Sequence, residues 1–194
     1  MLRFLLLILL FILHFSHFTK GRQPFTSSSS SSTNLVSTSC VHASYPNICV
    51  RTLSSYNYII NTPKDLAKAA VNVTLSRAKK ASNFLIKLKV QSKREKGALI
   101  DCIEQIGDSM YELRKAISEL KHLHKGNGFK LQMSNLETWV SAALTNEHTC
   151  LDGFKEINGK IRYDVKRKIT NVAKVTSNAL YLINQLDGGR GSKI

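Results

Sequence analysis

The segment Ser134–Phe154, SNLETWVSAALTNEHTCLDGF, combines a helix start, an amphipathic helix and a cysteine. Ser134 and Glu137 have the Ser-x-x-Glu spacing of a capping box, in which two side chains satisfy backbone amides at the beginning of a helix. The segment therefore predicts a helix from Ser134 to about Glu156. Its inner line comprises Leu136, Val140, Ala143, Cys150 and Phe154.

The same kind of apolar spacing predicts three further long helices. Thr62 as N-cap, Pro63 at the first helical position and Asp65 in the first turn predict where the first begins. The last is predicted from about Lys160 to Leu186. Long helices joined by short connections favour antiparallel neighbours, so we expect an all-α fold with an up-down-up-down bundle over residues 62–188. In the second helix, apolar residues step alternately by four and three: Leu99, Ile103, Ile106, Met110, Leu113, Ile117 and Leu120.

Four cysteines, Cys40, Cys49, Cys102 and Cys150, allow three disulfide pairings. Cys40 and Cys49 flank the turn-forming Tyr45-Pro46-Asn47, which favours a local bridge and leaves Cys102 to pair with Cys150. Cys102 lies toward the start of its helix and Cys150 toward the end of its own. In an antiparallel pair of helices the two cysteines therefore lie at the same level along the helix axes. Zinc is disfavoured because the chain has no Cys-x-x-Cys pair and no histidine at ligand spacing. We expect no metal and no cofactor.

The N-terminal residues 1–21 have the features of a secretion signal. Arg3 precedes an apolar run at residues 4–13 that is too short to span a bilayer, although a signal anchor is the alternative. The serine-rich residues 22–33 are expected to form a spacer. No later segment is apolar enough to span a membrane. We therefore predict a secreted, extracellular protein whose folded domain comprises residues 34–194.

The chain is strongly basic, with 28 Lys and Arg against 13 Asp and Glu and a formal net charge of +15. Residues 66–94 contain eight cations and no acid, and such a surface attracts polyanions. Outside the cell these are acidic polysaccharides or acidic proteins, and a solvated helix face is the alternative. No basic motif interleaved with aromatic residues supports nucleic-acid binding. The eight cations are Lys68, Arg77, Lys79, Lys80, Lys87, Lys89, Lys93 and Arg94.

No catalytic set of residues is recognisable. Ser141 has no evident base to activate it. His122 and His124 are two positions apart and point to different sides of a helix, so they do not share a metal. Carboxylates on the third long helix are expected to be solvated, because a filled bundle offers no cleft for a general acid and base. They are Glu137, Glu147, Asp152 and Glu156.

Two outward-facing rows are candidates for an interface with a protein partner. The second long helix has an acidic face with one aromatic residue. The third has a stripe of small polar residues, which forms a flat surface that loses little side-chain entropy on binding. Ordinary solvated helix exteriors are the alternative for both. The candidate residues are Glu104, Asp108, Tyr111 and Glu112 on the second helix, and Thr138, Ser141, Thr145 and His148 on the third.

One covalent modification is also predicted. Asn72-Val73-Thr74 fits the acceptor pattern for N-glycosylation, so Asn72 is expected to face solvent. Asn61 is a poor acceptor because Pro63 directly follows the threonine.

From about Asn34 onward, the chain resembles the plant pectin methylesterase inhibitors, within the invertase and pectin methylesterase inhibitor family. The resemblance implies an N-terminal helical hairpin at residues 34–61, the four-helix bundle and the two disulfides. It also implies a one-to-one complex in which the second and third bundle helices cover the substrate cleft of pectin methylesterase, regulating pectin de-esterification in the cell wall. The matching residues are Cys40 and Cys49 around Tyr45-Pro46, Cys102, and Trp139–Thr145 leading to Thr149–Phe154.

The same resemblance distinguishes between two targets. Invertase inhibitors carry a Pro-Lys-Phe element before the third bundle helix, whereas this chain has Asn127-Gly128-Phe129-Lys130 there. The methylesterase is therefore the favoured target, and an invertase inhibitor or a cationic pectin-binding protein of the apoplast without an enzyme target are the alternatives. No esterase domain follows Ile194, so we do not expect a pro-enzyme. The high positive charge has three explanations: the acidic face of the second helix meets a basic esterase while the first helix points away, the target is acidic, or the first helix contacts acidic pectin. The pectin contact would be made through Lys79, Lys80, Lys87 and Lys89.

Overall fold

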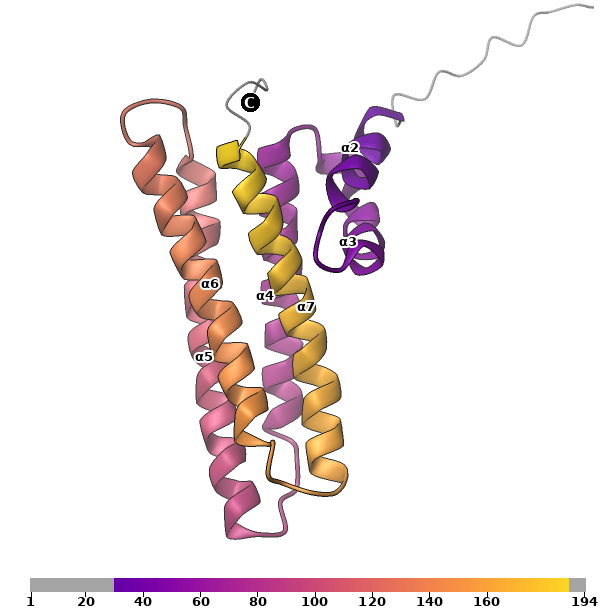
Figure 1. The fold of residues 1–194 in the computed structure, drawn as a ribbon, viewed down its shortest axis with the longest axis vertical. Helices are drawn as coiled ribbons and strands as arrows, with labels where there is room; N and C mark the ends of the chain where they lie inside the picture. The colour runs from indigo at the N-terminus through magenta and orange to yellow at the C-terminus, as the bar shows by residue number, and fades with distance from the viewer. Residues whose placement is uncertain (1–29, 189–194) are drawn as a thin grey trace, which may run out of the picture.

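In the computed structural model, which describes residues 30–188, four long helices stand side by side and two short helices pack next to one end of them (Figure 1). The long helices contact one another in the cyclic order α4, α5, α6, α7 and back to α4. This is the all-α up-down-up-down bundle that the sequence predicts. The elements are α2 (Ser30–Cys40), α3 (Pro46–Leu53), the 3-10 helix η1 (Ser54–Ile59), α4 (Pro63–Leu85), α5 (Lys93–His122), α6 (Phe129–Gly153) and α7 (Lys160–Gly188).

The predicted secretion signal lies outside the described residues. The helix α2 begins at Ser30, within the serine run that was expected to be a spacer up to residue 33. Residues 30–33 are therefore helical and do not form an extended spacer.

Side chains cap the first turns of α4 and α5. The prediction for α4 is confirmed: Thr62 Oγ1 accepts a hydrogen bond from the Asp65 amide at 3.1 Å, and Asp65 Oδ2 accepts one from the Thr62 amide at 3.1 Å. A second capping box, which the sequence analysis missed, begins α5. There the Glu95 amide donates to Ser92 Oγ at 3.1 Å, and the Ser92 amide donates to Glu95 Oε2 at 3.2 Å. Each box satisfies amides that lack partners within the helix.

The capping box predicted at Ser134 and Glu137 is wrong. The helix α6 begins five residues earlier, at Phe129, and Ser134 is an exposed residue inside it. The reason is burial: Met133 is buried and Phe129 packs against the core, so an additional helical turn extends the apolar line of α6. Removing these two side chains from water stabilises the longer helix more than a cap at Ser134 would, because a cap contributes only about 1 kcal/mol.

We predict that Ser92→Ala will lower the free energy of unfolding by about 1 kcal/mol, because it removes the acceptor for the Glu95 amide. Ser134→Ala is the matched control, and it should change stability by less than about 0.5 kcal/mol, since Ser134 caps no helix. Urea unfolding measures both. A larger loss for the Ser134 variant would contradict the assignment of the two helix starts.

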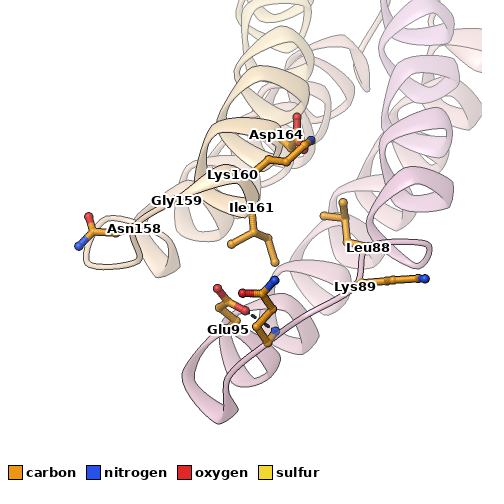
Figure 2. A pocket seen from close by; sticks show the side chains of 9 residues that line it. Leu88, Lys89, Glu95, Asn158, Gly159, Lys160, Ile161 and Asp164 are labelled. Carbon is orange, nitrogen blue, oxygen red and sulfur yellow. Dashed lines mark hydrogen bonds and ion pairs between the residues drawn. The ribbon is translucent and has the colours of Figure 1, made fainter.

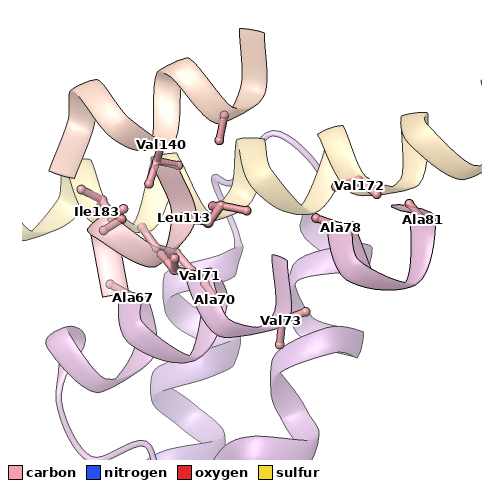
Figure 3. Packing of buried hydrophobic residues seen from close by; sticks show 14 of the residues in the cluster. Ala67, Ala70, Val71, Val73, Ala78, Ala81, Leu113, Val140, Val172 and Ile183 are labelled. Atoms are coloured by element: carbon pink, nitrogen blue, oxygen red, sulfur yellow. The ribbon is translucent and has the colours of Figure 1, made fainter. Parts of the chain in front are cut away.

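The core lies between the four long helices (Figure 3). Leu113 of α5, Val140 of α6 and Ile183 of α7 converge on Val71 of α4, and all four are fully buried. The helix α4 supplies mainly small side chains to this core, which allows its neighbours to approach closely. Its buried alanines are Ala67, Ala69, Ala70, Ala78 and Ala81.

The structure contains both expected disulfides. Cys40 and Cys49 join α2 to α3 with their Cα atoms 5.6 Å apart. Cys102 and Cys150 join α5 to α6 with a Cα separation of 4.3 Å. The second bridge lies where antiparallel packing brings the start of α5 level with the end of α6.

The short helices α2 and α3 form the N-terminal hairpin and are attached to the bundle through α7. The Asn178 side chain of α7 accepts a hydrogen bond from the Tyr45 amide at 2.9 Å and donates one to the Tyr45 carbonyl at 3.0 Å. Asn178 is itself buried. One side chain therefore satisfies both backbone groups at the turn of the hairpin and holds the hairpin against α7.

Candidate functional site

The seam between α5 and α6 carries an ordered cluster of charged and aromatic side chains. Lys115 Nζ lies 4.6 Å from the centroid of the Trp139 ring and 5.4 Å from that of Tyr111. The same ammonium group lies 3.1 Å from Glu112 Oε2. Cation–π attraction and the ion pair together restrict Lys115, and Lys115 in turn connects the outer surfaces of the two helices.

Three of the four residues predicted on α5 face solvent. Glu104 and Asp108 are exposed, and 60 % of Tyr111 is accessible. Glu112 differs, because it is half-buried and directed toward Lys115. The exposed part of this row is therefore acidic with one aromatic side chain, as expected, and Glu112 supports Lys115 instead of extending into solvent.

Three of the four residues predicted on α6 form an exposed row. Thr138, Ser141 and Thr145 are all exposed. Thr145 Oγ1 donates to the Ser141 carbonyl at 3.0 Å, and Thr149 repeats the pattern with the Thr145 carbonyl at 3.0 Å. These hydroxyl groups are engaged with their own helix, and threonine is already stiff about its first side-chain torsion. The row is consequently a shallow surface with few side-chain rotamers to lose on binding.

The fourth residue, His148, lies elsewhere on α6. It lines a hollow of about 300 Å³ between α6 and α7, together with Leu151, Arg162 and Lys166. The structure therefore separates His148 from the seam that α6 shares with α5.

Sequence reasoning missed Lys115 and Trp139 as members of the seam. Trp139 was noticed only as part of the motif shared with the family. Lys115 follows Tyr111 by four positions and Glu112 by three, which is the spacing of side-chain neighbours on a helix. That local signal identifies the α5 part of the cluster, whereas its contact with Trp139 depends on how α5 and α6 pack.

Glu147 is buried, which corrects the expectation that it is solvated. It follows Ala143 by four positions and precedes Cys150 by three, so it lies on the inner line of α6. Its Oε1 accepts hydrogen bonds from Ser109 Oγ of α5 at 2.8 Å and from Thr176 Oγ1 of α7 at 2.9 Å. Burial raises the pKa of Glu147 from 4.5 to about 7, against the opposing effect of these hydroxyl groups.

The position of Glu147 makes it a structural group. Its side chain has no accessible surface, so a substrate cannot reach it. Asp152 and Glu156 are exposed and Glu137 is half-buried. No group of three or more His, Cys, Asp or Glu residues suited to holding a metal ion occurs within residues 30–188.

A hollow of about 360 Å³ lies at the end of the bundle that holds the start of α7 (Figure 2). Its two carboxylates are both engaged. Glu95 caps α5, and Asp164 pairs with Lys160. The hydrogen bond from Lys160, together with the nearby Arg167, lowers the pKa of Asp164 below its usual value. Neither carboxylate is thus available as a general acid or base.

The basic residues of α4 are spread over its outer surface. Lys79, Lys80, Lys87 and Lys89 are all exposed, the last two just beyond the end of the helix. Asn72 is exposed on the same helix, and its side-chain amide nitrogen donates a hydrogen bond to the Lys68 carbonyl at 2.8 Å. None of the helices described here is long and apolar enough to cross a bilayer.

Comparisons with known proteins place this fold in a family. Residues 34–182 match the model of the family described as plant invertase/pectin methylesterase inhibitor. Pectinesterase inhibitor 3 of Arabidopsis thaliana is 50 % identical over 81 % of this chain and 82 % of its own length. Pectinesterase inhibitor 9 of Arabidopsis thaliana is 42 % identical over 87 % of this chain and 88 % of its own length.

Solved structures share the fold. The crystal structure of a mutant form of a pectin methylesterase inhibitor from Arabidopsis superposes with a TM-score of 0.63 at 24 % identity, covering 77 % of this chain and 95 % of that one. The family model covers the hairpin and almost all of the bundle, and the two relatives named above match over most of their length. On this evidence the chain belongs to the plant invertase/pectin methylesterase inhibitor family.

Proposed function

We propose that this protein is a secreted inhibitor of pectin methylesterase, which binds the enzyme one-to-one over its substrate cleft and so limits pectin de-esterification in the cell wall. The observation that carries the proposal is the exposed α5–α6 face in a chain that is 50 % identical to a protein named as a pectinesterase inhibitor. The two pectinesterase inhibitors described above are named as inhibitors of an enzyme, and both carboxylates of the hollow at the start of α7 are engaged within the fold.

The size of the α5–α6 face suits a protein interface. A helix of 30 residues, such as α5, is about 45 Å long, and two adjacent helices are together about 20 Å wide. That area is comparable to the roughly 800 Å² that each partner buries in a standard complex. The shallow polar row of α6 can approach a cleft closely, and Tyr111 supplies an aromatic group of the kind that dominates binding energy.

Charge supports the choice of face. The exposed row of α5 contains Glu104 and Asp108, whereas most cations lie elsewhere on the surface of this +15 chain. A basic esterase would be repelled by the molecule as a whole but attracted by this row, which favours α5 as the side that meets the enzyme.

The direct test is titration of the purified protein against pectin methylesterase and acid invertase at acidic pH. We expect esterase activity to fall to its minimum at equal molar amounts, with invertase unaffected. Inhibition of invertase alone would favour the family's other branch. Inhibition of neither enzyme would refute the proposal.

Thr145→Arg tests the face itself. The larger charged side chain would disturb the shallow row of α6, so we expect the inhibition constant for pectin methylesterase to rise by about tenfold or more. Ser76→Arg, at an exposed position of α4, adds the same charge outside the proposed interface and should leave inhibition within about twofold of the unchanged protein. Equal effects of the two substitutions would place the interface elsewhere.

Secretion to the apoplast and glycosylation at Asn72 belong to the same proposal. The apolar run after Arg3 supports export, and the exposed position of Asn72 on α4 supports access for the glycosylating enzyme. The missing Pro-Lys-Phe element supports the esterase over invertase as the target.

A further inference from the structure

Two adjoining hollows along α7 form a basic surface. One, of about 270 Å³, lies between α4 and α7, and the other, of about 410 Å³, lies on α7 where Ile48 of the hairpin forms part of its wall. Arg167 and Asn171 line both, so the hollows adjoin. We call this surface the basic groove; its cations are Arg77, Lys80, Lys166, Arg167, Lys168 and Lys174.

Several of these cations are held in place by neighbours that carry no charge. Lys168 Nζ lies 5.1 Å from the centroid of the Phe84 ring, and Lys174 Nζ lies 5.2 Å from that of Tyr45. Arg77 donates a hydrogen bond to the Asn171 side chain. Such contacts position a positive charge without neutralising it, so these cations are available to bind an anion.

Negative charge near the groove is sparse. None of the described residues that line the two hollows is acidic. Asp164 is nearby, with its Oδ1 3.6 Å from Arg167 Nη2, but it also pairs with Lys160. Most of the positive charge in the groove therefore lacks a partner in the chain.

We propose that the basic groove binds a segment of an acidic polysaccharide made of carboxylated sugars. The cations would bind its carboxylates, while Thr170 and Asn171 offer hydrogen bonds to sugar hydroxyls. Tyr163, which is 66 % exposed in the same hollow, offers a ring face on which a sugar can pack. Single-stranded nucleic acid fits less well, because it requires successive aromatic platforms for its bases.

The choice of a polyuronate rests on the proposed function, since removal of methyl esters from pectin produces carboxylates. The proposed location also differs from the one expected on α4. Lys80 lines the groove, whereas Lys89 lines the separate hollow that contains Glu95 and Asp164. The cations of α7, which the sequence analysis did not select, provide most of the groove.

The part of the basic groove between α4 and α7 lies on the side of the bundle opposite to the proposed esterase face. Each long helix contacts only its two neighbours extensively, so the outer surface shared by α4 and α7 is remote from that shared by α5 and α6. The polysaccharide and the esterase can therefore be bound at the same time. Retention on the polymer would raise the local concentration of inhibitor where the esterase acts.

The test compares two variants with equal changes in charge. The groove variant replaces Lys80, Lys166, Lys168 and Lys174 by glutamine, and the control replaces Lys93, Lys96, Lys125 and Lys130, which are exposed elsewhere. Binding to polygalacturonate is measured by calorimetry at low ionic strength, with fully methyl-esterified polymer, heparin and single-stranded RNA as comparison ligands. Inhibition of pectin methylesterase is measured on the same samples.

We expect the groove variant to bind polygalacturonate about tenfold more weakly and the control within about threefold of the unchanged protein, because only the first removes positioned contacts. The groove variant should inhibit the esterase normally, and the methyl-esterified polymer should bind weakly to the unchanged protein. The smaller variant Lys80→Gln/Lys166→Gln changes two exposed residues and repeats the comparison if the larger one fails to fold.

Equal losses in the two variants would overturn the groove as a site, because they would show that net charge alone determines binding. Absence of polygalacturonate binding, or tighter binding of heparin or RNA, would overturn the polyuronate assignment. Binding that depends on the groove in a protein that inhibits no esterase would refute the proposed function while leaving the groove as an anion site.

Discussion

Replacing Cys102 and Cys150 together by alanine will lower the free energy of unfolding by about 4 kcal/mol. The two cysteines are 48 positions apart, so without the bridge the unfolded chain gains the freedom of a long loop. The bridge also joins α5 to α6, which together form the proposed esterase face. Urea unfolding under non-reducing conditions measures the loss.

The other disulfide provides the matched control. Cys40 and Cys49 are only nine positions apart, so Cys40→Ala/Cys49→Ala should cost about 2–3 kcal/mol by the same loop-closure reasoning. Both pairs are buried, so the lost side-chain volume is the same in the two variants. A greater loss from the nine-residue bridge would show that loop length does not determine the stabilisation here.

Glu147→Gln will remove most of the loss of stability that the unchanged protein shows as the pH rises from about 4.5 to 7. The folded state raises the pKa of Glu147 from 4.5 to about 7 by burial, so it favours the protonated acid more than the unfolded state does. The contribution of Glu147 to stability is therefore greatest below about pH 4.5, and it falls by about 3 kcal/mol as the pH rises to 7 and above. Glutamine is uncharged at every pH and keeps one oxygen and one donor group, as the protonated acid does.

The expected result is a variant that equals the unchanged protein near pH 4 and exceeds it by about 2–3 kcal/mol near pH 8. Unfolding free energies measured across this range test it. Glu156→Gln, an exposed change on the same segment, should alter stability by less than about 0.5 kcal/mol. If the Glu147 variant retained the full pH dependence, another group would have to be responsible.

The bundle was predictable because its signals are local or repeat along one helix. Thr62 and Asp65 lie three positions apart and cap the helix that follows them, and the alternating apolar steps of α5 need no knowledge of its partners. The start of α6 was not predictable in this way. Ser92 and Ser134 begin the same Ser-x-x-Glu pattern, and only the burial of Met133 in the assembled core distinguishes a real cap from a residue inside a helix.

The candidate sites were harder to predict, because their residues come from different helices that only the packing brings together. Residue type suggested a solvated Glu147, whereas its two hydroxyl partners come from Ser109 and Thr176, on other helices. The basic run of α4 was visible in the sequence. Its combination with Lys166 and Lys168 of α7 required the contact between these helices, because the cations of α7 alternate with the apolar residues of its inner line.

The cyclic order of the four helices also sets the distance between the two outer surfaces of the bundle. A helix with its side chains is about 10 Å across, so the outer surfaces of α4–α7 and α5–α6 are separated by the width of two packed helices, about 20 Å. A polysaccharide segment lying between α4 and α7 is thereby kept about that far from an enzyme cleft covered by the opposite face. The segment that anchors the inhibitor and the segment excluded from catalysis must be different stretches of polymer, so anchoring does not deliver substrate to the blocked cleft.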